Sequence, residues 1–376
     1  MLHTYWRAAQ KVQSKAWKRR IGIYARHFRR IIRPATRLAC AAWPSAKTGI
    51  WWVVYCAACW PLAAKDAIAA VAPRMKAGTL VIVNPVSGGG SALRAEPLVA
   101  SYLAAQGRAV QFVHSRSSED VREQAANAAA SGYRYVVALG GDGAFHHVIE
   151  GVYGTDAIAG IFPAGNGNDI ARDLGIPGDP VTAANAFLHS KPRALDLVRV
   201  RFNNRRIVHY IGVGGMGLDA EVAHLANTRF KSCPGVTRYL AGTLWTFFRE
   251  QALELRAEMD GVRWAGRALF AAVANATSYG SGVRIAPEAK MDDGWLEVVL
   301  VGEVEWTRLL EALPILLTTG NLHFEEVQRF RCRRVRLEAE RPAKVHGDGE
   351  LLGESPAEFE VIPGAVRVMA PVERES

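Results

Sequence analysis

Residues 133–147 read YRYVVALGGDGAFHH, and this stretch decides the fold. A continuous apolar run ends in glycines and an aspartate, and a helix-like segment follows. Residues 79–90, TLVIVNPVSGGG, and residues 157–172, AIAGIFPAGNGNDIAR, repeat the arrangement. Apolar runs of this length predict buried strands of a parallel sheet. Because the carboxyl ends of parallel strands share one edge, we expect the three glycine loops to lie together where α/β proteins bind ligands.

Helical segments separate these strands. Residues 93–107 and 117–132 each end at a glycine, and the second begins with cap-type serines and acids in its first turn. Another strand is expected at 109–115. This strand–helix alternation predicts an α/β domain over residues 76–194 with right-handed crossovers.

From residue 195 the pattern changes to strands with few helices between them. Strands are expected at 195–202, 205–214, 267–276, 295–301, 334–340 and 357–363, and one helix at 237–253. Closely spaced strands of this kind predict a mainly antiparallel β domain over residues 195–376.

The three loops carry residues suited to a nucleotide phosphate. Glycines allow the backbone N–H groups to approach a ligand, and a helix N-terminus favours an anion. Asn84, Asn166 and Asn168 add neutral donors, and Asp142 and Asp169 are candidates for holding Mg²⁺ directly or through water. A single GGDG would equally well be a tight turn. No loop matches the P-loop or the dinucleotide-binding pattern, so the site is of another lineage.

The positive charge is confined to one end of the chain. The formal net charge is +10, yet residues 1–65 contain thirteen of the 46 Lys and Arg and no acid, which leaves 33 bases against 36 acids in the remainder. We therefore treat residues 1–75 as a basic arm suited to anionic lipid or nucleic acid. Within it, residues 48–64 form an uncharged stretch of 17 residues, short of the ~20 that span a bilayer. Met75 also offers an alternative start just before the first strand.

Five ordered motifs together resemble the catalytic domain of the diacylglycerol kinase and sphingosine kinase superfamily, including bacterial YegS-like lipid kinases. They are NPVSGGG, VVALGGDGAFHHVIEGV, GIFPAGNGNDIARDLGIP, RIAPEAKMDDGWLEVVLV and VHGDGELLGESPAEFEVIPGAVRVMAP. The resemblance covers residues 79–371. It implies an NAD-kinase-like nucleotide-binding α/β domain followed by a mainly antiparallel β-sandwich-like domain, with the active site between them. It also implies transfer of the γ-phosphoryl group of ATP to a membrane lipid, most simply diacylglycerol, with Mg²⁺.

The resemblance also implies roles for individual residues. Glu350 matches the proposed base that accepts the hydroxyl proton, and Asp142, Asp169 and Asp196 match acids of the metal and water network. Nucleotide contacts are implied for Asn84, Pro85, Val86, Ser87, Gly88, Ser115, Gly140, Gly141, Asp142, Gly143, Ala144, Phe145, His146 and Asn166. A separate metal site is implied at Asp293 with the backbone carbonyls of Lys290 and Trp295.

The chain departs from the family pattern in its second motif. That motif usually reads GGDGT-x-N, whereas here Ala144 lacks a hydroxyl and His146 replaces an amide. A catalytically impaired lipid-binding relative is therefore one alternative. Others are a kinase for a sphingoid base, ceramide or other lipid alcohol, and a more distant NAD kinase.

Simpler interpretations accompany the individual residues. His146 and His147 are neighbours on a helix, so we expect them to face different directions and to make a poor metal pair. Glu350 follows Asp-Gly, which is good hairpin-turn chemistry. The five cysteines describe no disulfide framework.

The expected partners follow from the lipid substrate. We expect an anionic membrane surface and no nucleic acid, with a homodimer as an option. The catalytic body is expected in the cytoplasm, peripheral or N-terminally anchored at the inner face of the cell membrane.

Overall fold

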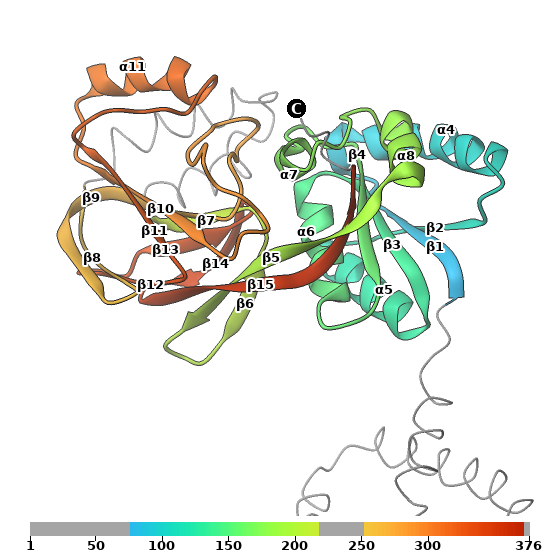
Figure 1. Cartoon of the computed structure of the whole chain (residues 1–376), viewed down its shortest axis with the longest axis horizontal. Coiled ribbons are helices and arrows are strands. Elements are labelled where there is room, and N and C mark those ends of the chain that lie inside the picture. The colour runs from blue at the N-terminus through green and yellow to red at the C-terminus, as the bar shows by residue number, and fades with distance from the viewer. Residues whose placement is uncertain (1–75, 218–251, 372–376) are drawn as a thin grey trace, which may run out of the picture. The chain divides into compact units, whose positions relative to one another are not determined.

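The computed structural model describes residues 76–217 and 252–371, apart from a few side chains at the start of the first strand and in one helix. The basic arm at 1–75 and most of the helix expected at 237–253 lie outside the described residues. In Figure 1 the described chain forms helix-covered strands and a separate β-rich part. Within the described ranges, no helix combines the length and apolarity that crossing a bilayer requires.

Four parallel strands form the first part, as the sequence predicted. The elements are β1 (Lys76–Val83), η1 (Ser87–Gly89), α4 (Ser91–Ala105), β2 (Val110–His114), α5 (Ser118–Ala130), β3 (Tyr133–Gly140), α6 (Asp142–Val152), β4 (Ile158–Pro163), α7 (Asp169–Asp173) and α8 (Pro180–His189). β1 lies between β2 and β3, and β3 pairs with β4. Helices α4 and α8 pack together on one face, and α5 and α6 on the other (Figure 1).

Local capping explains where these helices start. The side chain of Ser117 accepts the Asp120 N–H at 3.2 Å and caps α5. Helix α8, which the sequence analysis missed, has the same kind of start. Asp179 accepts the Thr182 N–H at 2.8 Å, and Pro180 occupies the first turn. Asp-Pro was a visible signal for this helix.

The second part is mainly antiparallel, again as predicted. Its elements are β5 (Lys191–Phe202), β6 (Ile207–Tyr210), β7 (Val213–Gly217), β8 (Leu253–Met259), β9 (Val262–Ala274), β10 (Leu296–Gly302), α11 (Trp306–Leu316), β11 (Val327–Cys332), β12 (Arg334–Ala339), β13 (Lys344–Gly347), β14 (Glu350–Glu354) and β15 (Ala357–Ala370). Along β12, buried Val335 and Leu337 alternate with exposed charged residues, the period-two pattern of a strand with one solvated face.

Two long strands connect the two parts of the sheet. β15 pairs antiparallel with β5 from Ala357↔Phe202 to Ala370↔Lys191, with an irregularity between Ile362 and Val366. Near its end, β15 also pairs in parallel with β4 at Val368↔Ala159. β15, the last strand within the described residues, therefore completes the sheet to which β1 to β4 belong, and it fixes the preceding hairpin relative to the glycine loops.

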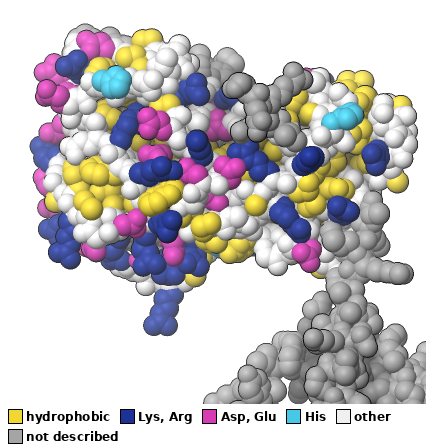
Figure 2. All heavy atoms as spheres, in the orientation of Figure 1, with side chains coloured by type: hydrophobic (Ala, Val, Ile, Leu, Met, Phe, Trp, Pro, Cys, Tyr) yellow, Lys and Arg dark blue, Asp and Glu magenta, His cyan; other side chains and the backbone are white. Residues whose placement is uncertain are grey.

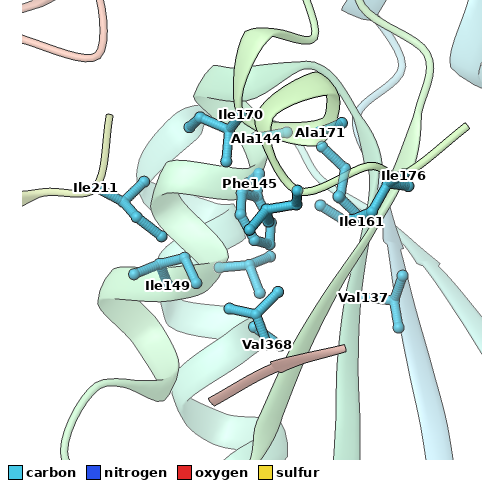
Figure 3. Close-up of a cluster of buried hydrophobic side chains, with 14 of the residues drawn as sticks. Val137, Ala144, Phe145, Ile149, Ile161, Ile170, Ala171, Ile176, Ile211 and Val368 are labelled. Carbon is cyan, nitrogen blue, oxygen red and sulfur yellow. The ribbon is translucent and has the colours of Figure 1, made fainter. Parts of the chain in front are cut away.

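The core beneath the glycine loops draws on both parts. It is shown in Figure 3 with side chains from α6, α7, β3, β4 and β15, including Val137, Phe145, Ile149, Ile161, Ile170, Ile211 and Val368. Phe145 is fully buried, and Ile211 comes from the loop between β6 and β7. A second core fills the β-rich part around Tyr210 and Phe359. Because α6 is packed into this shared core, the glycine loop at its N-terminus is held in place by residues of both parts.

Charged side chains of both signs are interspersed on the face seen in Figure 2. Cross-strand ion pairs join β5, β12 and β15, where Arg199 and Arg334 both contact Glu360, at 2.5 and 3.2 Å. Such exposed pairs contribute little to stability individually. Their exposed charges lie on the solvent side of β12, as the alternation along that strand predicts.

Candidate active site

The three glycine loops pack directly against one another. An ideal Cβ on Gly88 would lie 2.3 Å from the carbonyl oxygen of Ala164, and one on Gly165 would lie 2.5 Å from the Cα of Gly141. Gly88 also has a φ of +56°, in the left-handed region. The sequence-based expectation that these loops gather at one edge is confirmed by these contacts, which join the first loop to the third and the third to the second.

Asp142 joins the second loop to the third. Its Oδ2 accepts the N–H of Asp169 at 3.0 Å, and its Oδ1 accepts the N–H of Ile170 at 3.1 Å. These are N–H groups of the first turn of α7, so the carboxylate satisfies orphan donors there. Burial raises the pKa of Asp142 to about 7, and the charge of Asp169 adds to the rise against the two backbone donors.

Asp169 joins the third loop to the β-rich part. Its Oδ2 accepts the N–H of Ser281 at 2.8 Å, and its Oδ1 accepts a hydrogen bond from Arg172 at 2.5 Å. Nearby, Asp173 accepts the N–H and the hydroxyl of Thr277 at 2.6 and 2.7 Å. Both acids that the sequence offered for Mg²⁺ are thus also structural, because each holds backbone donors in place.

The remaining predicted nucleotide residues lie at the same edge. Asn84 donates its N–H to Leu139 of β3, and the Ser115 hydroxyl donates to the Val83 carbonyl of β1 at 3.3 Å. Val86 and Asn166 are exposed on the first and third loops. Ala144 and Phe145 are buried in α6 and contribute packing around the second loop.

Asp196 on β5 holds two turns of the β-rich part. Its Oδ2 accepts the Gly294 N–H at 2.7 Å, and its Oδ1 accepts the Gly364 N–H at 2.8 Å. Burial raises the pKa of Asp196 against these two hydrogen bonds, and the charges of Asp293 and Asp292 add to the rise. The carboxylates of Asp292 and Asp293 therefore lie near that of Asp196, and Asp292 is paired with Arg193 at 2.7 Å.

The predicted metal residues Lys290, Asp293 and Trp295 lie at that turn. Asp293 accepts the Trp295 N–H at 3.0 Å through Oδ1, and its Oδ2 pairs with Arg331 at 2.6 Å. Three carboxylates in one turn region suit a hard cation, which prefers oxygen ligands. The Arg331 guanidinium supplies part of the compensating charge.

Glu350 begins β14, immediately after the turn that joins it to β13. Asp348 and Gly349 have φ values of 51° and 81°. Two consecutive residues with positive φ are the signature of the two-residue hairpin turn that Asp-Gly favours. The hairpin interpretation of this motif is therefore confirmed. The hairpin also contacts α6, because Glu350 Oε1 lies 2.9 Å from His147 Nε2.

Asp348 fixes the hairpin on its surroundings. Its Oδ1 accepts the Gly212 N–H at 2.8 Å, and its Oδ2 accepts the Ile211 N–H at 3.0 Å. The same Oδ2 lies 2.9 Å from His146 Nδ1. The turn, the β6–β7 loop and α6 are thereby held together by one buried carboxylate.

The two adjacent histidines both contact the hairpin that carries Glu350. Both are buried, and their ring centroids are 5.0 Å apart in an edge-to-face arrangement. His146 contacts Asp348, while His147 lies between Glu350 and Glu150, with Nδ1 3.3 Å from Glu150 Oε2. The two rings lie nearer to each other than expected for neighbouring residues on a helix: a nitrogen from each ring and a Glu350 oxygen all lie within 4.8 Å of one another.

The carboxylates of this group change the pKa values of the histidines, and the histidines change those of the carboxylates. Burial lowers the pKa of His147, but its contacts with Glu150 and Glu350 outweigh burial and raise the pKa to about 9. Burial acts to raise the pKa of Glu350, but the hydrogen bond and charge of His147 hold it below its ordinary value. Glu350 is therefore ionised at neutral pH.

Sequence reasoning missed the parts played by His147, Glu150 and Asp348. A local signal existed: Glu150 stands four residues after His146 and three after His147, and residues so spaced are neighbours on one face of a helix. No local signal pairs His146 with a residue about two hundred positions later.

Comparisons with known proteins agree on this architecture. A model of the diacylglycerol kinase catalytic domain matches residues 78–200, and a model of the YegS C-terminal NAD kinase beta sandwich-like domain matches residues 212–370. A crystal structure of a diacylglycerol kinase from Bacillus anthracis str. Sterne has a TM-score of 0.61 at 18% identity, over 78% of this chain and 97% of that chain. That likeness shows the fold.

Two curated proteins are similar in sequence. A protein named diacylglycerol kinase from Mycobacterium tuberculosis is 31% identical over 292 residues, which are 77% of this chain and 94% of that protein. A protein named "Probable lipid kinase YegS-like" from Pseudomonas aeruginosa is 32% identical over 254 residues, which are 67% of this chain and 82% of that protein.

Proposed function

Because the chain belongs to the diacylglycerol kinase family of lipid kinases, we propose that its acceptor is diacylglycerol, phosphorylated at its free hydroxyl. The chain is an ATP-dependent lipid kinase. The relatives named diacylglycerol kinase support this acceptor, and the observation that supports phosphoryl transfer is the meeting of two elements on α6. Its N-terminus belongs to the packed glycine loops, and its second turn contacts Glu350.

The glycine loops are suited to hold the phosphates of ATP. The nucleotide site is formed by the first loop, Ser115, the second loop and Asn166, and the α/β domain at 76–194 supplies it. Gly143 lies in the first turn of α6, and the space where its Cβ would stand is open among the described residues, so phosphate oxygens can approach the N–H groups there. The hydrogen bonds of Asp142 and Asp169 hold the loops in position. This positioning matters because a shift of about 1 Å in a reacting group costs on the order of 10²-fold in rate.

Glu350 is the residue placed to accept the proton of the lipid hydroxyl. It is ionised, its side chain is 39% exposed, and it stands at the rim of α6 on a hairpin anchored by Asp348. A general base must reach the proton that it accepts while remaining positioned. The β domain at 195–376 thus completes the site with this one carboxylate.

Mg²⁺ fits two groups of oxygen ligands in the chain. Asp142 and Asp169 would reach ions bound to the ATP phosphates, and Asp196 supports the turn whose Asp293, with the carbonyls of Lys290 and Trp295, would hold a second ion. When bound near the phosphates, Mg²⁺ supplies neutralisation of their charge during transfer.

The basic arm at 1–75 would bring the catalytic part to an anionic membrane surface at the inner face of the cell membrane. Thirteen Lys and Arg without an acid in residues 1–65 would be attracted to anionic lipid. Deleting residues 1–74 should weaken sedimentation with phosphatidylglycerol vesicles while leaving activity on detergent-solubilised lipid. Equal sedimentation of both forms would remove the arm from membrane attachment.

The test of the function is a comparison of Glu350→Gln with Glu354→Gln. Glu354 is an exposed residue at the far end of the same strand, so its substitution is a matched control. With radiolabelled ATP and a panel of diacylglycerol, ceramide, sphingosine and NAD, we expect phosphorylation of diacylglycerol by the wild type. Glu350→Gln should lose on the order of 10²-fold or more in kcat with little change in the KM for ATP.

Two outcomes would contradict the proposal. Near-normal turnover by Glu350→Gln would exclude this residue as the base. Preferential phosphorylation of ceramide, sphingosine or NAD would show that diacylglycerol is not the preferred acceptor.

A further inference from the structure

We propose that His146, His147 and Glu350 form a site for a divalent transition metal of the Zn²⁺ type, distinct from any Mg²⁺ that accompanies ATP. One nitrogen from each ring and one oxygen of Glu350 lie within 4.8 Å of one another. Tetrahedral zinc at ~2.1 Å from nitrogen and oxygen needs ligand atoms separated by about 3.4 Å. Glu350 Oε1 already lies 2.9 Å from His147 Nε2, within the separation that two ligands of one ion require.

The two histidines are oriented as metal ligands usually are. The Nδ1 atom of His146 lies 2.9 Å from Asp348 Oδ2, and that of His147 lies 3.3 Å from Glu150 Oε2. A carboxylate on one ring nitrogen fixes the ring and leaves the other nitrogen for the metal. In His147 that other nitrogen, Nε2, already faces Glu350.

The supporting carboxylates are themselves held in place. Asp348 accepts the N–H groups of Ile211 and Gly212, so the ring of His146 is positioned through the β6–β7 loop. Glu150 lies on α6, with Oε2 3.8 Å from His146 Nε2 and 3.3 Å from His147 Nδ1. Both histidines thus stand on a helix packed into the core, and the third ligand stands on a fixed hairpin.

The charge and exposure of the group suit a dication. Three carboxyl groups, those of Glu150, Asp348 and Glu350, lie against two imidazoles, so acidic side chains outnumber the rings. The side chains of His146 and His147 are 3% and 10% exposed, while that of Glu350 is 39% exposed. A metal here would keep an open position on the Glu350 side for water.

The donor set selects against Mg²⁺. Two imidazoles and one carboxylate favour Zn²⁺ and its neighbours, whereas Mg²⁺ is bound through oxygen. Occupation would also engage the carboxylate that accepts the lipid proton. Zn²⁺ should therefore inhibit the kinase, a consequence that rests on the proposed role of Glu350.

Direct metal titration of the full chain tests the site. Chelator-stripped protein is titrated with Zn²⁺ against a chromophoric competitor, and with Co²⁺ by visible absorption. Wild type should bind one equivalent that His146→Asn, His147→Asn and Glu350→Gln each weaken by at least about 100-fold, since even losing a supporting carboxylate costs 10–100-fold. Glu350→Gln, at the exposed rim, provides a readout should a histidine variant fail to fold.

His114→Asn is the matched control. His114 Nε2 lies 2.7 Å from Glu96 in an exposed pair, so its loss should leave the equivalent unchanged. The proposal is overturned when wild type and His147→Asn bind the same amount of Zn²⁺, or when His114→Asn loses the same equivalent. Binding without inhibition would uphold the metal site and contradict the role of Glu350 as the base.

Discussion

Gly143→Ala separates nucleotide contact from loop architecture. Gly143 lies in the first turn of α6, and an ideal Cβ built on it meets no atom within 4 Å among the described residues. Alanine is favoured over glycine in a helix by up to ~1 kcal/mol, so the free energy of unfolding should stay the same or rise slightly. A lost function in this variant therefore cannot be attributed to a damaged fold.

The expected kinetic result follows from the open space at Gly143. If ATP phosphates approach the N–H groups at the start of α6, the added methyl group occupies that approach. We expect the KM for ATP to rise by about tenfold, equivalent to ~1.4 kcal/mol, with an unchanged KM for the lipid. The assay is initial-rate kinetics with varied ATP, supported by isothermal titration of ATP and by thermal melting.

Gly165→Ala is the comparison that damages the architecture itself. Its Cβ would lie 2.5 Å from the Cα of Gly141, whereas ordinary contacts begin at 3.4 Å, so the second and third loops must separate by nearly 1 Å. This overpacking should cost about 1–3 kcal/mol of stability as well as activity. Unchanged ATP kinetics in Gly143→Ala, together with a wild-type melting temperature, would refute phosphate binding at this turn.

Two further predictions concern residues away from the loops. Gly151→Ala places a Cβ 2.6 Å from both the Ala125 Cβ and the Arg122 carbonyl oxygen, so urea unfolding should show a loss of about 1–3 kcal/mol with the KM for ATP unchanged; equal stability would contradict the close packing of α5 on α6. Cys332 is buried, and burial followed by the charge of Asp260 raises its pKa to about 12, so its thiol stays protonated at pH 8. Peptide mass spectrometry should find Cys332 unalkylated by iodoacetamide until the protein is unfolded, and rapid native alkylation would contradict this.

The part of the fold that the sequence predicts is the part with local causes. The runs ending at Val83, Gly140 and Pro163 are apolar without interruption, and only strands buried on both faces tolerate this, so β1, β3 and β4 follow directly. The gathering of their loops follows from the geometry of a parallel sheet. By contrast, the course of β15 along both β5 and β4 depends on pairings with residues far away in the chain, and no local pattern encodes them.

The predicted acids show the same limit at the level of the site. Asp142, Asp169 and Asp196 were recognised as chemically important from their motifs. What they hold was not visible, because the N–H groups that they accept belong to other segments, such as Ser281 for Asp169 and Gly364 for Asp196. A carboxylate in a loop looks the same in sequence whether it binds a metal or ties two loops together. The N–H groups that surround the carboxylate in the folded structure show which of these two roles it has.

The turn at Asp348 brings the local and the tertiary causes together. Its Asp-Gly sequence sets the two positive φ values, so the hairpin itself is encoded by two residues. The carboxylate of that same Asp348 accepts the N–H groups of Ile211 and Gly212 and contacts His146, which seats the hairpin on α6. Glu350 follows two residues later. Its position against His147 therefore depends on the Asp-Gly turn, which the sequence predicts, and on the contact of Asp348 with His146, which the sequence does not predict. The departure at His146 therefore has a structural meaning: an imidazole there reaches the buried turn carboxylate that orients the proposed base.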